Sequence, residues 1–351
     1  MLSCLKSGRP VVRTSHVSIT LVLVGLVALG VSIALLAKLQ ERSPGEDGAG
    51  STDKGQENAP AEGEEGVPEF ELGLIGDIPY TIEEARKTEA LFGEMDSEKL
   101  AFVVHVGDIK SGSSPCTDEL FLREKERFED SANPLVYVPG DNEWTDCERT
   151  GYDPIERLER LREIFFEGDE SLGEETILLT RQSADFPENM RWSYGGATFL
   201  SLNVPGPNNN RNSVSGEYAT RNEANLGWMR EGFERAAAEE SSALMIVLQA
   251  NPGFELPPEE RTGYNDLLAA LEEETVDFGK PVVLVHGDTH THRIDKPMAS
   301  STSGERVENF TRVETFGSPM VGWVRAGVDT SDPEVFTFQP ETVKNTMEGR
   351  P

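Results

Sequence analysis

Four aspartates each come directly after an apolar run that ends in glycine. The segments read "ELGLIGD" to Asp77, "FVVHVGD" to Asp108, "LVYVPGD" to Asp141 and "VVLVHGD" to Asp288. In a sheet of parallel strands the carboxyl ends share one edge, where α/β folds bind ligands, so four carboxylates would converge there. Each glycine allows a sharp turn and a close approach to a ligand. Crowded carboxylates repel one another, and metal cations are the natural compensation. We therefore expect a metal site at this edge.

Histidine is scarce in the chain, and its placement is uneven. Of the five histidines, His286, His290 and His292 lie within seven positions around Asp288. His290 and His292 are two residues apart, so in an extended chain their side chains point the same way. His286 and His105 lie at the ends of strand-like runs, where a hydrogen-bonded buried histidine is the expected role.

The acidic residues sit within a regular alternation of strand-like and helical patterns. The strand-like apolar runs cover residues 70–76, 101–106, 135–138, 196–202, 243–249 and 281–286. The helical patterns cover residues 82–96, 117–130, 154–166, 222–240 and 257–275. Residues 310–339 read as mostly β. This alternation predicts an α/β sandwich.

The order of these blocks resembles that of the calcineurin-like metallophosphoesterase superfamily. The blocks of that family read D-x-H, G-D-x-x-D, G-N-H-E, a later His before Pro, and G-H-x-H. The corresponding segments here read "GDIP", "GDIKSG", "PGDNEW", "QANPG" and "HGDTHTH". The resemblance covers residues 70 to about 325 and implies two β-sheets flanked by helices. It also implies a hydrolase of phosphate esters or anhydrides that uses two divalent metal ions.

Four histidine positions of the family carry other residues in this chain. Pro79, Asn142 and Asp288 replace three of these histidines, and the histidine before Pro252 is absent as well. In addition, Asp141 stands where the family has Asn.

Carried over position by position, the resemblance implies a metal site rich in oxygen. One metal would be held by Asp77, Asp108 and His290. The other would be held by Asp108, Asp141 and Asp288, with help from Asn251. Such a site favours Mg²⁺, Mn²⁺ or Ca²⁺ over zinc, with iron as an alternative, because zinc sites lean on imidazole and thiolate.

The resemblance also bears on proton transfer during catalysis. Asn142 occupies the position of the histidine that protonates the leaving group in this family, and an amide does not titrate. His292 is the first candidate to replace that acid, with Glu143 behind it. From its position, His292 would either contact the phosphate or face solvent. Asp146, a few residues further on, reads as a solvated loop residue.

The first 69 residues differ from the rest. No charge interrupts residues 17–37, which are long and apolar enough to cross a bilayer as a helix. Basic residues precede this span, so we expect residues 1–16 in the cytoplasm and a single-pass protein of the cell membrane with its domain outside. A cleaved signal peptide, giving a secreted or periplasmic protein, is the alternative. Residues 38–69 read as an acidic disordered linker and residues 70–340 as the phosphoesterase domain.

Charge and cysteine content narrow the partners and the compartment. The net charge is −31, so a nucleic-acid partner is not expected, and we expect a phosphorylated small molecule or phosphoester as substrate. In an oxidising compartment Cys116 and Cys147 would form a disulfide; two unpaired buried thiols are the alternative. The sequence does not indicate an oligomeric state.

A function of another class also fits the sequence. The four lost histidines would suit a non-catalytic surface module that keeps the fold and one structural cation. Against it stand the carboxylates near the lost positions, because they remain able to bind metal.

Overall fold

The computed structural model describes residues 70–213 and 215–343, which belong to one compact unit. The expected N-terminal residues 1–16, membrane segment 17–37 and linker 38–69 all lie outside the described residues. In the described ranges no helix has the length and apolar character needed to span a membrane.

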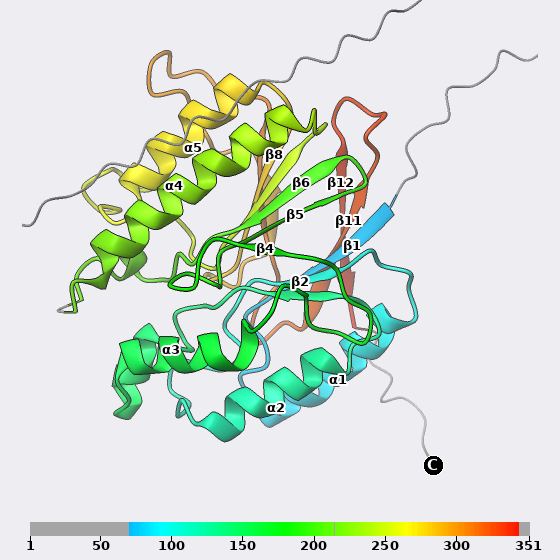
Figure 1. Ribbon diagram of the computed structural model, residues 1–351, viewed down its shortest axis with the longest axis vertical. Coiled ribbons are helices and arrows are strands. Elements are labelled where there is room, and N and C mark those ends of the chain that lie inside the picture. Colours follow the sequence, from blue (N-terminus) through cyan, green and yellow to red (C-terminus); the bar gives the residue numbers. More distant parts are fainter. Residues whose placement is uncertain (1–69, 214, 344–351) are drawn as a thin grey trace, which may run out of the picture. The chain divides into compact units, whose positions relative to one another are not determined.

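Two β-sheets form the centre of the unit (Figure 1). The first sheet has the strand order β12-β11-β1-β2-β3, in which β1, β2 and β3 are parallel while β11 and β12 run antiparallel to their neighbours. Its strands are β1 (Phe70–Ile75), β2 (Val103–His105), β3 (Leu135–Tyr137), β11 (Gly322–Val328) and β12 (Phe336–Thr342).

The second sheet has the order β4-β5-β6-β7-β8-β10-β9. Its central strands β6, β7, β8 and β10 are parallel, and antiparallel strands complete both edges. Its strands are β4 (Thr180–Arg181), β5 (Met190–Tyr194), β6 (Ala197–Ser201), β7 (Leu244–Val247), β8 (Val282–His286), β9 (Arg293–Asp295) and β10 (Phe310–Glu314).

Helices lie on the outer sides of the sheets (Figure 1). Three of them, α1 (Ile82–Asp96), α2 (Asp118–Glu129) and α3 (Pro154–Phe165), lie beside the first sheet, and α4 (Glu217–Ala238) and α5 (Asn265–Phe278) lie beside the second. Two short 3-10 helices, η1 (Thr145–Thr150) and η2 (Asn208–Asn210), follow β3 and β6. The N-termini of α1, α2 and α3 are capped by the side chains of Thr81, Thr117 and Asp153, which accept hydrogen bonds from first-turn amides.

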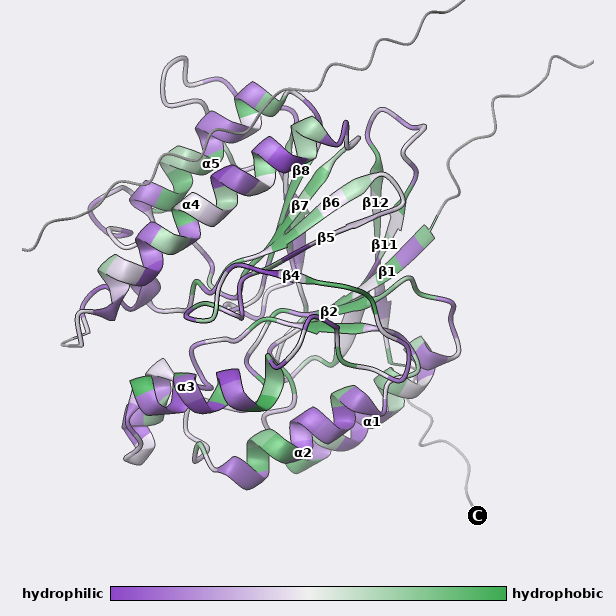
Figure 2. Ribbon diagram, in the orientation of Figure 1, coloured by the Kyte–Doolittle hydropathy of each residue, from purple (hydrophilic) through white to green (hydrophobic). Residues whose placement is uncertain are grey.

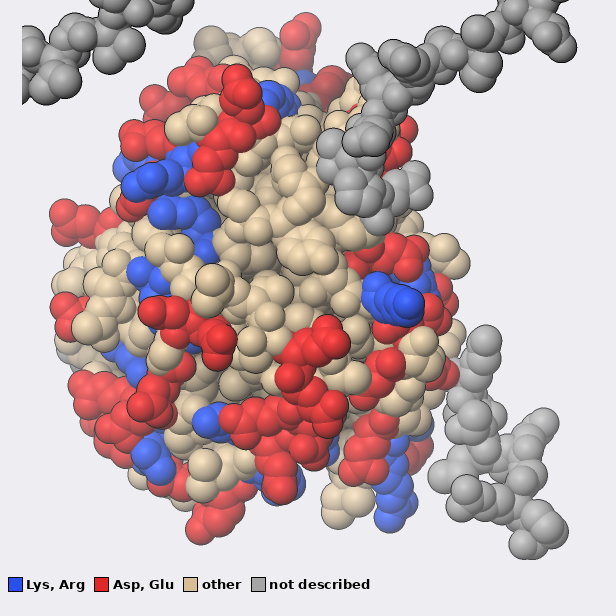
Figure 3. Space-filling view, turned by 45° about the vertical axis from the view of Figure 1, so that its right-hand side comes forward, with Lys and Arg blue, Asp and Glu red and all other residues tan. Residues whose placement is uncertain are grey.

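The apolar residues form two cores. The larger core fills the space between the sheets and beneath α1, α2 and α3, and the smaller one lies between the second sheet and α4 and α5. Phe102, directly before β2 of the first sheet, packs edge-on against Trp192 and Phe199 of the second, with ring centroids 5.6 and 5.0 Å apart. The strands are accordingly hydrophobic, while the outer helices carry polar residues (Figure 2). On the face shown in Figure 3, acidic side chains outnumber basic ones.

The two-sheet α/β sandwich predicted from the sequence is confirmed, and the largely β segment 310–339 contains β10, β11 and most of β12. Two helix boundaries were wrong. Helix α5 begins at Asn265 rather than at 257, because Pro257 and Pro258 open a stretch of turns. Helix α4 begins at Glu217 rather than at 222, directly after Gly216 in the left-handed conformation. Strands β4, β5 and β9 were not predicted.

Candidate active site

The four predicted aspartates meet where the two sheets come together. Asp77, Asp108 and Asp141 follow β1, β2 and β3 of the first sheet, and Asp288 follows β8 of the second. The backbone N–H of Asp288 donates a hydrogen bond to Asp77 Oδ1 over 3.0 Å and so joins the two sheets at this edge. Asp77 is fully buried, and Asp108 and Asp141 are nearly so. The convergence expected from the Gly-Asp pattern is therefore present.

Two of the glycines before these aspartates make room for a neighbouring carboxylate. A Cβ added to Gly140 would lie 2.1 Å from Asp108 Oδ1, and one added to Gly287 would lie 2.0 Å from Asp77 Oδ2. The loops of Gly140 and Gly287 thus each receive the acid of another loop in the space that the glycine leaves, whereas Gly76 faces Val106 and Gly107 faces the backbone of Gly140. Of the four glycines in these blocks, only Gly107 has a positive φ.

The left-handed backbone conformation occurs instead at the candidate functional residues. Asp77, Asp108, Asp288 and His290 have φ values of 54°, 58°, 78° and 58°. Asp visits this region more readily than most residues, but each such position still costs on the order of 1 kcal/mol. Strain of this kind clusters at functional sites, where the surrounding structure holds it in place.

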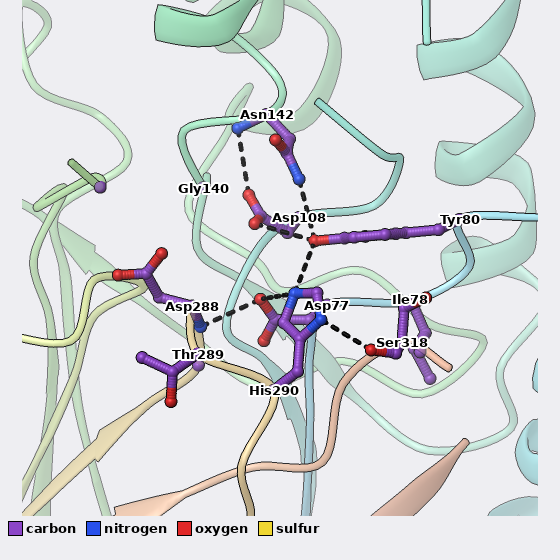
Figure 4. Close-up of polar contacts among 12 residues, drawn as sticks. Asp77, Ile78, Tyr80, Asp108, Gly140, Asn142, Asp288, Thr289, His290 and Ser318 are labelled. Carbon is purple, nitrogen blue, oxygen red and sulfur yellow. Dashed lines mark hydrogen bonds and ion pairs between the residues drawn. The ribbon is translucent and has the colours of Figure 1, made fainter. Parts of the chain in front are cut away.

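Tyr80 lies at the centre of the cluster (Figure 4). Its hydroxyl donates a hydrogen bond to Asp108 Oδ2 over 3.0 Å and accepts one from Asn142 Nδ2 over 2.9 Å. The same oxygen lies 3.2 Å from His290 Nε2. Sequence reasoning missed Tyr80. The available indication was an aromatic hydroxyl directly after Pro79, the first position at which the family's histidine is lost.

His290 is oriented by a backbone carbonyl. Its Nδ1 lies 2.7 Å from the carbonyl oxygen of Ser318, which can only accept, so Nδ1 carries the proton. Nε2 then faces the cluster, 3.5 Å from Asp77 Oδ1 (Figure 4). A histidine held in this way presents a lone pair to a metal ion.

Gln249 holds Asp108 from the side of the second sheet. Its Nε2 donates to Asp108 Oδ2 over 3.2 Å, and its Oε1 accepts from the Gly206 amide over 2.9 Å. Asn251, the predicted additional ligand, instead uses its side-chain oxygen to accept from the Gly253 amide and donates its backbone N–H to Asp288. The "QANPG" block therefore contacts the cluster through the side chain of Gln249 and the backbone of Asn251.

Glu143 and His292, the predicted replacements for the family's acid, are both placed as supporting residues. Glu143 is fully buried and accepts hydrogen bonds from the amides of Ile109 and Gly140, which ties the loops after β2 and β3 together. The Nδ1 of His292 lies 2.8 Å from the Glu314 carbonyl oxygen, and its ring stacks on Phe316. Neither side chain lines the cavity that opens over the cluster.

A cavity of about 400 Å³ opens over the cluster. Its lining includes Asp108, Asp141, Asp288 and His290, together with Tyr80 and Asn142. Asp146 also lines it, is only 6% exposed, and forms an ion pair with Arg149. The interpretation of Asp146 as a solvated loop residue was therefore wrong, because η1 folds its carboxylate inward.

The clustered carboxylates resist ionisation. Burial raises the pKa values of Asp77 and Asp108, and the charges of neighbouring acids, Asp141 and Glu143 among them, raise both further. Burial, followed by the charge of Asp288, raises the pKa of Asp141 to about 8. Bringing these groups together as anions is therefore costly unless a cation joins them.

The donor set of the cluster suits a divalent cation. Asp77 Oδ2 is a buried oxygen with no hydrogen-bond partner in the structure, and carboxylate oxygens with one imidazole suit Mn²⁺, Mg²⁺ or Ca²⁺. Within residues 70–213 and 215–343, no group of three or more His, Cys, Asp and Glu side chains is arranged to hold a metal ion. The Tyr80 hydroxyl stands between Asp108 and His290 instead. The residues fit a divalent cation by donor type and by the unpaired oxygen.

Two further expectations concern histidines and cysteines around the site. His105 and His286 are buried, and burial lowers the pKa of each to about 3, so both stay neutral structural residues near physiological pH. Cys116 and Cys147 form a disulfide that links the loop after β2 to η1.

Comparisons with known proteins identify the fold. A dimetal phosphatase from Danio rerio superposes with a TM-score of 0.51 and 13% identity, covering 80% of this chain and 98% of that one. PhoD gives a TM-score of 0.49 at 12% identity, covering 81% of this chain and 73% of the other. The chain therefore has the calcineurin-like metallophosphoesterase fold, as its sequence blocks predict. No protein-family model matches the sequence, and no curated protein sequence matches it either.

Proposed function

We propose that this protein is a metal-dependent hydrolase of phosphate esters or anhydrides that binds two divalent cations, with Mn²⁺, Mg²⁺ or Ca²⁺ favoured. The observation that carries the proposal is the convergence of four aspartates from two sheets, three of them on left-handed backbone, with one buried carboxylate oxygen left unpaired. A sheet edge with only a structural role would not bring together buried carboxylates that repel one another. The fold shared with a dimetal phosphatase supports the same reading.

The candidate metal ligands form two sets that share Asp108. Asp77, Asp108 and His290 would hold one cation, and Asp108, Asp141 and Asp288 the other. Bound cations would polarise the phosphoryl group and strengthen water as a nucleophile.

Asn142 faces the cavity with an amide, so it can donate a hydrogen bond to a phosphoryl oxygen but no proton to a leaving group. Turnover should therefore favour leaving groups that depart without protonation, such as aryl oxides and phosphates.

The second candidate is a non-catalytic module of the same fold. The observation that favours it is the Tyr80 hydroxyl, which already satisfies Asp108 and contacts His290 without any ion. In that function the hydrogen-bonded cluster would be a permanent feature, and the cavity would bind a ligand without cleaving it.

Hydrolysis of an aryl phosphate panel during titration with Mn²⁺, Mg²⁺ and Ca²⁺ separates the two candidates. The hydrolase function predicts turnover that saturates with metal and is lost in Asp108→Asn. Asp185→Asn, an exposed loop position outside the cavity, is the matched control and should behave as wild type. Absence of turnover at every metal concentration would support the binding module.

The cellular location of the domain and its class of substrate are also proposals. We place the domain outside the cytoplasm, tethered to the cell membrane by residues 17–37, with a phosphorylated small molecule as substrate. The Cys116–Cys147 disulfide supports an oxidising compartment. Protease accessibility of the domain in intact cells tests this placement.

A further inference from the structure

One side chain in the cavity lining has a permanent positive charge. Among the described residues that line the cavity, Arg149 is the only Lys or Arg, whereas four aspartates contribute to the same wall. Its side chain is 59% exposed, and its Nη1 forms an ion pair with Asp146 Oδ2. Asp146 is buried and therefore fixes one arm of the guanidinium, while the exposed remainder of the fork is accessible to a ligand.

Gly112 shows where this guanidinium lies. A Cβ added to Gly112 would be 2.6 Å from Asn142 Oδ1, 2.7 Å from Arg149 Nη1 and 2.7 Å from Asp146 Oδ2. These three groups therefore surround one small space that is open only because residue 112 has no side chain. Arg149 Nη1 and Asn142 Oδ1 therefore both border that space.

The backbone that carries Arg149 is well anchored. Arg149 belongs to η1, whose start is tied to the Asp141 carbonyl by the amide of Asp146 and the hydroxyl of Thr145. The disulfide from Cys147 to Cys116 joins η1 to the loop that also carries Gly112. A cation held on such a support is positioned in advance for its ligand.

The neighbour of Arg149 defines the part of the substrate that it would meet. Asn142 occupies the position at which the family resemblance places the group facing the leaving group, and an amide supplies no proton there. A leaving group that departs as an anion instead needs its charge stabilised. A guanidinium fork binds phosphate oxygens in this way, through two charge-assisted hydrogen bonds.

We propose that Arg149 binds the departing phosphate of a phosphoanhydride, so that the substrate class of the site is a small compound with two linked phosphates; this inference rests on the proposed hydrolase function. The oxygen of water forms a bond to the attacked phosphorus, and the bridging P–O bond breaks. Its electron pair passes to the bridging oxygen of the departing phosphate. The proton released from water goes to solvent at the cavity mouth, and Arg149 pairs with the added negative charge.

Binding of non-cleavable probes tests the anion contact without turnover. With Mn²⁺ at a fixed free concentration, wild type should bind methylenebisphosphonate more tightly than methylphosphonate. Arg149→Gln should reduce that preference about 10- to 100-fold, as expected for a lost charge-assisted hydrogen bond. Arg235→Gln is the matched control, since Arg235 has the same 59% exposure and one acidic partner but does not line this cavity. An unchanged preference in Arg149→Gln would overturn the inference.

Hydrolysis separates a failure of this inference from a failure of the proposed function. The ratio of kcat/KM for inorganic pyrophosphate to that for 4-nitrophenyl phosphate should fall about 10- to 100-fold in Arg149→Gln and stay constant in Arg235→Gln. If both substrates are cleaved and the ratio is unchanged, the role of Arg149 is wrong while the hydrolase function stands. If wild type cleaves neither substrate with any metal, the hydrolase function is overturned, and the reaction step assigned to Arg149 with it.

Discussion

Replacing Asp141 by asparagine should stabilise the metal-free protein in a pH-dependent way. Asp141 is 7% exposed, and burial with the charge of Asp288 raises its pKa to about 8 in the folded protein. In the unfolded chain the same carboxyl titrates near pH 3.9. Between these values the unfolded state loses this proton first, so the free energy of unfolding falls as pH rises through that window.

The size of the effect follows from the same shift. Each pKa unit corresponds to about 1.4 kcal/mol, so Asp141 alone lowers stability by about 1.4 kcal/mol per pH unit from about pH 4 to 8. The full loss above pH 8 is on the order of 5 kcal/mol, a large part of the stability of a typical domain. Asparagine has nearly the same shape and no charge, so Asp141→Asn should remove this slope.

Urea denaturation of EDTA-treated protein between pH 5 and 8 measures how strongly Asp141 makes the free energy of unfolding depend on pH. The wild-type midpoint should drop by about 1–2 M more than that of Asp141→Asn across this range. Saturating Mn²⁺ should reverse the wild-type trend, because a bound cation favours the ionised carboxylate. Parallel pH profiles for wild type and Asp141→Asn without metal would refute the reasoning.

Three other variants test separate parts of the site. Cys116→Ser with Cys147→Ser opens a loop with a sequence separation of 31 residues and should lower the free energy of unfolding by about 3–4 kcal/mol, measured by urea denaturation; a loss below about 1 kcal/mol would contradict this. Asn142→His should speed alkyl phosphate hydrolysis by about 10²- to 10⁴-fold and 4-nitrophenyl phosphate far less, and equal gains on both would argue against a missing acid. Tyr80→Phe removes the hydroxyl between Asp108 and His290 and should tighten Mn²⁺ binding in calorimetry, whereas weaker binding would show that the hydroxyl helps to hold the ion.

Those parts of the fold and site that depend on local pattern were predictable from the sequence. Each Gly-Asp block ends an apolar run, so the positions of Asp77, Asp108, Asp141 and Asp288 at strand ends followed from the order of residues alone. The two-sheet sandwich followed from the alternation of runs and from the family resemblance. The short strand β4, with two residues, carries too few residues for an alternation to be visible.

Contacts between distant segments could not be predicted in the same way. The Tyr80 hydroxyl meets Asn142 62 residues away and His290 210 residues away. Gln249 reaches Asp108 across 141 residues. These pairs depend on how the two sheets pack, which no local periodicity encodes, and the inward position of Asp146 depends on the fold of η1 in the same way.

The number of divalent cations bound per chain tests the central claim most directly. Purified wild-type protein should be titrated with Mn²⁺ by calorimetry in the presence of inorganic phosphate, with Asp108→Asn and Asp185→Asn in parallel. The account predicts two ions per chain for wild type and for Asp185→Asn, and loss of most of that binding in Asp108→Asn, whose side chain would contact both ions. Full binding by Asp108→Asn, or no binding by wild type, would contradict it.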